Sequence, residues 1–97
     1  MQRRAWVFRL KKGKEQDYRK AHLNVWPELI AAAQAAGLRN HSIFLSGDLV
    51  FAYAEAEDLQ ETLAELDRME VTRRWNEEMS ELMQEVNGSP LEEVCHF

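Results

Sequence analysis

The spacing of apolar and polar positions changes along the chain and predicts where strands and helices lie. Side chains alternate between the two kinds in residues 4–10 (RAWVFRL), which is typical of a strand, and Gly13 ends this pattern. From about residue 14 to residue 36, apolar side chains recur every three or four positions. This spacing predicts a helix, and Gly37 supplies its C-terminal stop.

The rest of the chain reads as a hairpin, two helices and a last strand. Ser46, Gly47 and Asp48 form a short glycine-containing connection, which is typical of a hairpin between two antiparallel strands. The sequence Asn-Gly-Ser-Pro ends the last helix, and the apolar residues of the tail favour a short strand. The strands of the hairpin are expected at residues 41–45 and 49–56, the two helices at 58–66 and 71–86, and the last strand within 91–97.

The order strand, helix, strand, strand, helix, strand is that of a ferredoxin-like α+β fold. Two helical segments then cover one face of an antiparallel sheet. No repeat, low-complexity stretch or linker divides the chain, so residues 1–97 are expected to form a single domain.

Both faces of this sheet are expected to be apolar, because apolar residues occupy both alternating sets of strand positions. Helices of the same chain cover one face only, so a second subunit, a ligand or both must cover the other. We therefore expect a homodimer in which two sheets face each other, a dimeric α/β barrel-like assembly, with a small cavity in or beside the sheet. One set contains Trp6, Phe8, Phe51 and Tyr53, and the other contains Val7, Val50, Ala52 and Ala54.

Charge and composition exclude several classes of partner. The 97 residues include 17 acidic and 12 basic side chains, a net charge of -5, which disfavours nucleic acid, and no stretch is long and apolar enough to span a membrane. The N-terminal apolar run meets Arg9 after four residues, so no signal peptide is expected. The single cysteine, Cys95, fits a reducing compartment and is expected to be a structural, partly buried thiol. A cytoplasmic protein is predicted.

Common catalytic motifs are missing from the sequence. The glycines form neither a dinucleotide loop nor a phosphate loop, and the histidines and the cysteine lack zinc-ligand spacing. No serine stands in a nucleophile elbow. We therefore expect no metal, no cofactor and no covalent intermediate.

The stretch YRKAHLNVWPELI, residues 18–30, carries the strongest signal for a site. Tyr18 and His22 are four residues apart and must share one helix face. Pro27 disfavours the helical conformation at Trp26, so the helix should break there and resume at Pro27. A break one turn after His22 opens space beside its ring, which favours a pocket. The alternative is that His22 is a hydrogen-bonded packing residue.

Other candidate residues also have two interpretations. Trp75 lies among the methionines of the last helix, a pattern that is more often a core position than a binding site. His41, at the start of a strand, is either a surface residue or a pocket wall. Glu28 fits a carboxylate at a helix N-terminus, and His96 is expected to be structural.

Taken together, several segments resemble the L-rhamnose mutarotase family. The resemblance covers nearly the whole chain in order, and its most specific part is Y-x-x-x-H-x-x-x-W-P-E-L. The segments that carry it are RRAWVF, YRKAHLNVWPEL, NHSIFL, RRWNEEM and LEEVCHF. The resemblance implies dimeric ferredoxin-like proteins that interconvert the α and β anomers of an unphosphorylated sugar without a cofactor.

The resemblance also implies roles for individual residues. His22 matches the proton-donating acid, Tyr18 a sugar-contacting tyrosine, and Trp75 the first of two adjacent tryptophans that hold the sugar ring. The second tryptophan is replaced by Asn76, and a tyrosine at the start of the hairpin is replaced by His41.

A further departure follows the histidine. Leu23 and Asn24 stand where relatives commonly have an acidic or amide residue followed by proline. The acid is kept while the walls differ, so the substrate is expected to be L-rhamnose or another 6-deoxy or neutral hexose.

The predicted function is that of an isomerase, a sugar mutarotase that uses general acid–base catalysis. Histidine suits this chemistry because its pKa of about 6.5 lets it give and take a proton near neutrality. The aromatic faces of Trp26 and Trp75 would cover the sugar ring, and Tyr18, His41 and Asn76 would bind its hydroxyls. The alternative is a dimeric α+β barrel that binds a ligand, or a small monooxygenase, without mutarotase activity.

Overall fold

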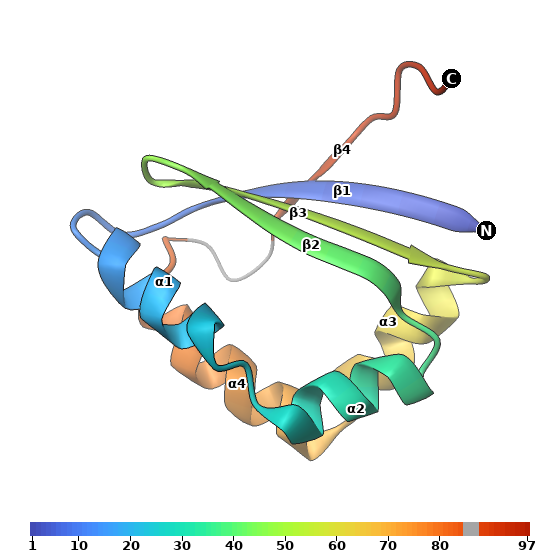
Figure 1. Ribbon diagram of the computed structural model, residues 1–97, viewed down its shortest axis with the longest axis horizontal. Helices are drawn as coiled ribbons and strands as arrows, with labels where there is room; N and C mark the ends of the chain where they lie inside the picture. The colour runs from blue at the N-terminus through green and yellow to red at the C-terminus, as the bar shows by residue number, and fades with distance from the viewer. Residues whose placement is uncertain (85–87) are drawn as a thin grey trace.

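The computed structural model describes residues 1–84 and 88–97, and it consists of one layer of helices against one antiparallel sheet (Figure 1). All four helices lie on the same side of the sheet, and the C-terminal tail leads away from the body of the molecule. The elements, in chain order, are β1 (Gln2–Arg9), α1 (Glu15–Leu23), α2 (Pro27–Ala35), β2 (Arg39–Ser46), β3 (Leu49–Ala56), α3 (Leu59–Asp67), α4 (Glu70–Ser80) and β4 (Ser89–Leu91).

The sheet confirms the predicted α+β, ferredoxin-like fold. Its four strands follow the order β2-β3-β1-β4, and all neighbouring strands are antiparallel. The hairpin β2–β3 turns at Gly47, which has a φ of 60°, a value that favours glycine.

Strand pairing decides which side chains face the helices. Trp6 pairs with Ala52 and Phe8 pairs with Val50, and Ala52 and Val50 are buried beneath the helices. Val7 instead pairs with Phe51 on the opposite face, here called the outer face. Both faces are therefore apolar, as predicted.

The predicted grouping of the aromatic strand residues was wrong, however. Residues directly opposite each other in an antiparallel pair lie on the same face. Trp6 and Phe8 therefore face the helices, whereas Phe51 and Tyr53 lie on the outer face.

The core between the helices and the sheet contains two clusters of buried side chains. One consists of Leu38, Ala54, Ala56, Leu59 and Leu66. The other consists of Leu10, Tyr18, Val50 and Met79, and Trp75 packs against it. The second cluster forms the floor of the candidate site, because Tyr18 belongs to it.

The helix break predicted at Trp26 is confirmed. Helix α1 ends at Leu23, Asn24 leaves the helical region with a φ of −136° and a ψ of 68°, and α2 begins at Pro27. Trp26 is extended, as expected for a residue before proline, with a ψ of 126°. Its carbonyl oxygen accepts hydrogen bonds from the amides of Leu29 and Ile30 at 3.0 and 3.1 Å, which starts α2.

Helix α4 is shorter than the predicted helix over residues 71–86, because it ends at Ser80. The backbone that follows turns towards β1 and its extension. The Leu82 carbonyl oxygen accepts a hydrogen bond from the Lys11 amide at 2.8 Å, and the Gln84 amide donates to the Arg9 carbonyl at 2.9 Å. Tertiary hydrogen bonds thus replace the helical ones. The predicted helical position of Val86 lies outside the described residues.

The C-terminal strand differs from the prediction over residues 91–97. Strand β4 covers Ser89–Leu91, where Leu91 pairs with Ala5, and residues 92–97 have no regular structure. Cys95 is exposed, so the prediction of a partly buried structural thiol was wrong. The tail beyond Leu91 has no strand partner along β1, which explains its exposure.

Within the described part of the chain, no helix has the length and apolarity needed to span a membrane.

Candidate active site

Helix α1 presents Tyr18 and His22 one turn apart on the side that faces the core. The two rings stack at a tilt of 32°, with centroids 4.2 Å apart. Tyr18 is buried and His22 half-buried, so His22 is the more accessible residue of the pair. The shared face predicted from their spacing is confirmed.

His22 has a defined orientation of its two ring nitrogens. Nδ1 lies 2.9 Å from the backbone carbonyl oxygen of Tyr18. A carbonyl oxygen only accepts hydrogen bonds, so Nδ1 carries the hydrogen in the neutral ring. Nε2 is then a base when the ring is neutral and a proton donor when the ring is charged.

Trp75 of α4 links His22 to the helix break. Its ring makes an edge contact with His22, with centroids 5.4 Å apart, and another with Trp26, with centroids 5.2 Å apart. The break at Pro27 places Trp26 there, since it turns the chain from α1 into α2. The aromatic row Tyr18–His22–Trp75–Trp26 therefore combines residues of α1, of α4 and of the break between α1 and α2.

The far end of this row is held by charged side chains. The Arg74 guanidinium lies over the Trp26 ring at 5.7 Å and is 3.6 Å from the Glu28 carboxylate. Glu28 lies in the first turn of α2, which confirms the predicted carboxylate at a helix N-terminus. These contacts are exposed and position the Trp26 ring more than they stabilise the fold.

A cavity of about 280 Å³ opens between α1 and β2, beside His22. Its size is at the lower end for small-molecule sites, which suits a small ligand. A small cavity beside the sheet was expected, but most of its lining was not. The lining residues are Tyr18, Arg19, His22, Leu23, Ile43 and Leu45. Ile43 and Leu45 were missed, because alternation puts them on one face of β2 but only their pairing with Ala52 and Val50 shows that this is the helix side.

His41 of β2 lies within electrostatic range of His22. Its side chain keeps an exposed surface, yet nearby protein removes water from part of the ring. This desolvation lowers the pKa of His41 below its ordinary value of 6.5, and the positive charge on His22 lowers it further. His41 is not among the residues that line the cavity, so its interpretation as a pocket wall stays a prediction.

Two predicted site residues differ in how well the structure accommodates them. Burial raises the pKa of Tyr18 to about 12, so its hydroxyl stays protonated and available as a hydrogen-bond donor. Asn76 follows Trp75 on α4 and is exposed, turned about 100° around the helix from it. Its role in binding a sugar stays a prediction.

No group of three or more His, Cys, Asp or Glu side chains in residues 1–84 and 88–97 is placed to hold a metal ion.

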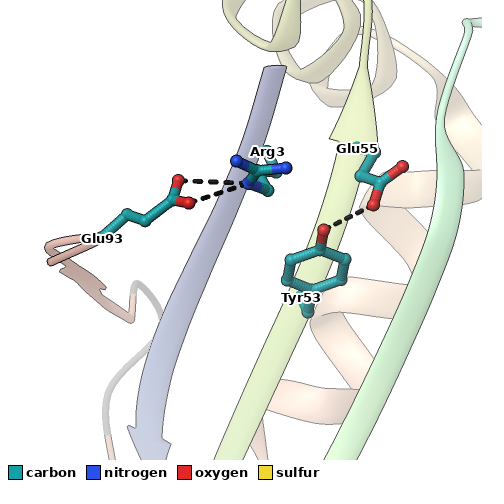
Figure 2. Close-up of polar contacts among 4 residues, drawn as sticks. All are labelled: Arg3, Tyr53, Glu55 and Glu93. Carbon is teal, nitrogen blue, oxygen red and sulfur yellow. Dashed lines mark hydrogen bonds and ion pairs between the residues drawn. The ribbon is translucent and has the colours of Figure 1, made fainter. Parts of the chain in front are cut away.

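A second cavity, of about 620 Å³, lies on the outer face near the end of the chain. Figure 2 shows two polar pairs there: the Tyr53 hydroxyl donates to Glu55 on β3, and the Arg3 Nε lies 2.9 Å from a Glu93 oxygen of the tail. The hydrogen bond from Tyr53 lowers the pKa of Glu55 and raises that of Tyr53. His96 lines this second cavity, is exposed, and is not part of the aromatic row.

Comparison with known proteins places the chain in a family. The family model of L-rhamnose mutarotase matches residues 3–96. The chain belongs to the L-rhamnose mutarotase family. The L-rhamnose mutarotase of Listeria monocytogenes is 36% identical over 96 residues, which covers 94% of this chain and 89% of that protein.

Solved structures agree with this L-rhamnose mutarotase assignment. The crystal structure of the L-rhamnose mutarotase from Formosa agariphila superimposes with a TM-score of 0.86 at 28% identity and covers 100% of this chain and 99% of that chain. A dimeric ferredoxin-like protein from an uncultured marine organism has a TM-score of 0.65 at 14% identity, covers 98% of this chain and 95% of that one, and shares the fold. The family resemblance expected from the sequence motifs is confirmed.

Proposed function

We propose that this protein interconverts the α and β anomers of L-rhamnose, with His22 as its acid–base residue. The observation that carries the proposal is the hydrogen bond from His22 Nδ1 to the Tyr18 carbonyl oxygen, 2.9 Å long, because it reserves Nε2 of this cavity-lining residue for the reaction. Membership of the L-rhamnose mutarotase family supports the reaction.

The reaction requires one proton to be given and another to be taken. His22 in its charged form donates the Nε2 proton to the ring oxygen of the sugar while the anomeric hydroxyl loses its proton to a base. The bond between the anomeric carbon and the ring oxygen breaks, and an open-chain aldehyde forms. Rotation about the adjacent carbon–carbon bond and ring closure, with both protons returned, give the other anomer. Positioned acid–base catalysis of this kind contributes about 10² to 10⁴-fold.

The aromatic row supplies the surroundings of the reacting atoms. We assign Trp75 and Trp26, whose rings contact each other beside His22, to the apolar face of the sugar ring. Tyr18 donates a hydrogen bond to a sugar hydroxyl, because its raised pKa keeps it protonated. We assign His41 and Asn76 to the remaining hydroxyls. These two residues replace family aromatic residues, so they set the preference between L-rhamnose and other neutral hexoses.

We also propose that the protein works as a cytoplasmic homodimer joined through the outer face. Phe44 and Phe51 pair on that face, and Phe44 is 61% exposed in the single chain. Contiguous exposed apolar side chains mark association surfaces. A neighbour of the same fold is a dimeric protein. The free Cys95 fits a reducing compartment.

The decisive experiment is NMR measurement of α/β exchange of L-rhamnose at equilibrium. Wild-type protein should broaden or transfer saturation between the anomeric proton signals, and His22→Ala should lose this acceleration by about 10²-fold or more. His96→Ala, which removes an exposed histidine of the tail, is the matched control and should behave as wild type.

Two results would contradict the proposal. Sugar binding without faster exchange would indicate a ligand-binding protein, and a shifted absorption band on haem addition would favour the oxygenase alternative. Wild-type protein that is silent with L-rhamnose but active with L-fucose or another hexose would reassign the substrate and keep the reaction.

A further inference from the structure

Strand β2 contains a β-bulge at the position where His41 enters the sheet. Arg39 pairs with Glu55 and Ser42 pairs with Tyr53, so Asn40 and His41 together oppose the single residue Ala54. Asn40 has a φ of 50°, in the left-handed region. Bulges with a left-handed first residue bend the strand and redirect side chains, and they are common beside active sites.

The bulge sends the two side chains to different faces. The Asn40 amide donates a hydrogen bond to Glu55 at 2.8 Å, and Glu55 lies on the outer face. Ala54, opposite the bulge, is 1% exposed and faces the helices. Ile43, two residues after His41, lines the cavity beside His22. His41 therefore belongs to the same side of β2 as Ile43, the side of the cavity.

The surroundings of His41 favour its neutral form. Desolvation and the charge on His22 of α1 both lower its pKa. Neighbouring charges do not reverse this effect: the Arg39 guanidinium is hydrogen-bonded to the carbonyl oxygens of Gln34 and Leu38, and the Glu55 carboxylate is held on the outer face by Tyr53 and Asn40. A neutral imidazole has one nitrogen with a free lone pair.

We propose that His41 is a second catalytic residue, the base that takes the anomeric hydroxyl proton while His22 protonates the ring oxygen. This inference rests on the proposed mutarotase function. His22, from the helix layer, then acts on the ring oxygen, and His41, from the sheet, acts on the anomeric hydroxyl. Both oxygens are bonded to the anomeric carbon.

The proton balance closes within each turnover. Ring opening moves one proton from the anomeric oxygen to His41 and one from His22 to the ring oxygen, while the bond between that oxygen and the anomeric carbon breaks. Ring closure on the other face of the aldehyde reverses both transfers and re-forms the bond. Both histidines end in their starting state, so no further reactant is consumed.

The test compares His41→Gln with wild type in the anomer-exchange assay, together with L-rhamnose titrations that measure binding. Glutamine keeps hydrogen-bonding groups but does not titrate, so kcat should fall by about 10²-fold while the affinity for L-rhamnose changes little. Ser42→Ala is the matched control, because Ser42 pairs with Tyr53 on the outer face and is exposed. It should keep wild-type exchange.

The pH profile supplies a readout that a purely structural role would not move. Since His41 must be neutral to accept a proton, the wild-type rate should rise with pH below 6.5, the ordinary histidine value, and this rise should be absent in His41→Gln. An unchanged kcat in His41→Gln, or a weaker affinity with unchanged kcat and pH profile, would overturn the inference and leave His22 catalysis intact. An inactive wild type would refute the mutarotase proposal itself.

Discussion

The Nδ1 atom of His22 lies 2.9 Å from the carbonyl oxygen of Tyr18, and the rings of the same two residues stack 4.2 Å apart. The hydrogen bond uses the Tyr18 backbone and the stacking uses its side chain. The tautomer of His22 therefore depends on the helix, whereas the surface beside the ring depends on the phenol.

This separation predicts the behaviour of Tyr18→Phe. The backbone carbonyl and the stacked ring remain, so the pH dependence of anomer exchange should keep its wild-type form. Loss of one hydrogen bond to the sugar, worth about 1 kcal/mol, should weaken L-rhamnose binding by about fivefold. A titration followed by NMR, with exchange rates at several pH values, checks both parts. A changed pH profile with unchanged affinity would show that the phenol takes part in proton transfer.

Tyr18 also predicts a loss of stability at alkaline pH. Its pKa is about 12 in the folded chain and 10.0 in the ordinary state, so the unfolded chain loses this proton first. The contribution is complete below pH 10 and is lost as the pH rises towards 12. Urea unfolding from pH 8 upwards should show this decline, and Tyr18→Phe should flatten it. Tyr53→Phe is the comparison variant, because the main cause of the raised Tyr53 pKa is the hydrogen bond to Glu55, whereas burial raises the pKa of Tyr18.

Trp75 should matter for both folding and binding, because it makes edge contacts with His22 and Trp26. Trp75→Leu removes both aromatic pairs and should lower the free energy of unfolding by about 1–3 kcal/mol, since each pair contributes about 0.5–1.5 kcal/mol. Trp75→Phe keeps an aromatic ring and should cost less. Denaturant unfolding measures the loss. Equal costs for the two variants would show that packing volume, rather than aromatic contact, dominates at this position.

The outer face predicts the effect of a charge on self-association. Phe44→Glu places a carboxylate next to Phe51 and should convert the expected dimer into a monomer at micromolar concentration. Ile30→Glu is the matched control, because Ile30 is 45% exposed on α2, in the helix layer. Sedimentation velocity distinguishes the two forms. A wild-type monomer, or dissociation by the Ile30 variant instead, would place the interface elsewhere or remove it.

Gly88, just before β4, packs so closely against the Phe8 ring that there is no room for a larger side chain. A Cβ atom at this position would lie 2.6 Å from Cδ1 and 2.9 Å from Cζ of Phe8, closer than real contacts allow. Gly88→Ala should therefore destabilise the fold by about 1–3 kcal/mol. Adding Phe8→Leu should recover part of this cost in a double-mutant cycle. Additive effects of the two substitutions would show that the cost of Gly88→Ala does not come from its contact with the Phe8 ring.

The sequence predicted the strands, the hairpin and the helix break, because each depends on local signals such as alternation, Gly47 and Pro27. It misplaced the end of α4 and the last strand. The backbone of residues 82–84 bonds to β1 and its extension, and β4 pairs only as far as Leu91, and neither tertiary contact has a local signature.

The candidate site could likewise be predicted where it depends on local spacing, and not where it depends on strand pairing. The Tyr18–His22 pair follows from helical spacing, whereas the contribution of Ile43 and Leu45 required the strand register. The bulge at Asn40 and His41 had no sequence signal strong enough to predict it. Pairing of β2 with β3 decides where the extra residue is accommodated.

Strand β3 alternates between buried residues under the helices and partly exposed residues on the outer face. Tolerance to substitution should therefore alternate from one residue of this strand to the next, because neighbouring residues lie on opposite faces. Substitutions at Phe51 or Tyr53 leave the helix side of the sheet, where the candidate site lies, unchanged. Loss or gain of a single codon within Leu49–Ala56 exchanges the two faces at once. Length variation in this family should accordingly be confined to the ends of the hairpin, and its sequence diversity to one side of the sheet at a time.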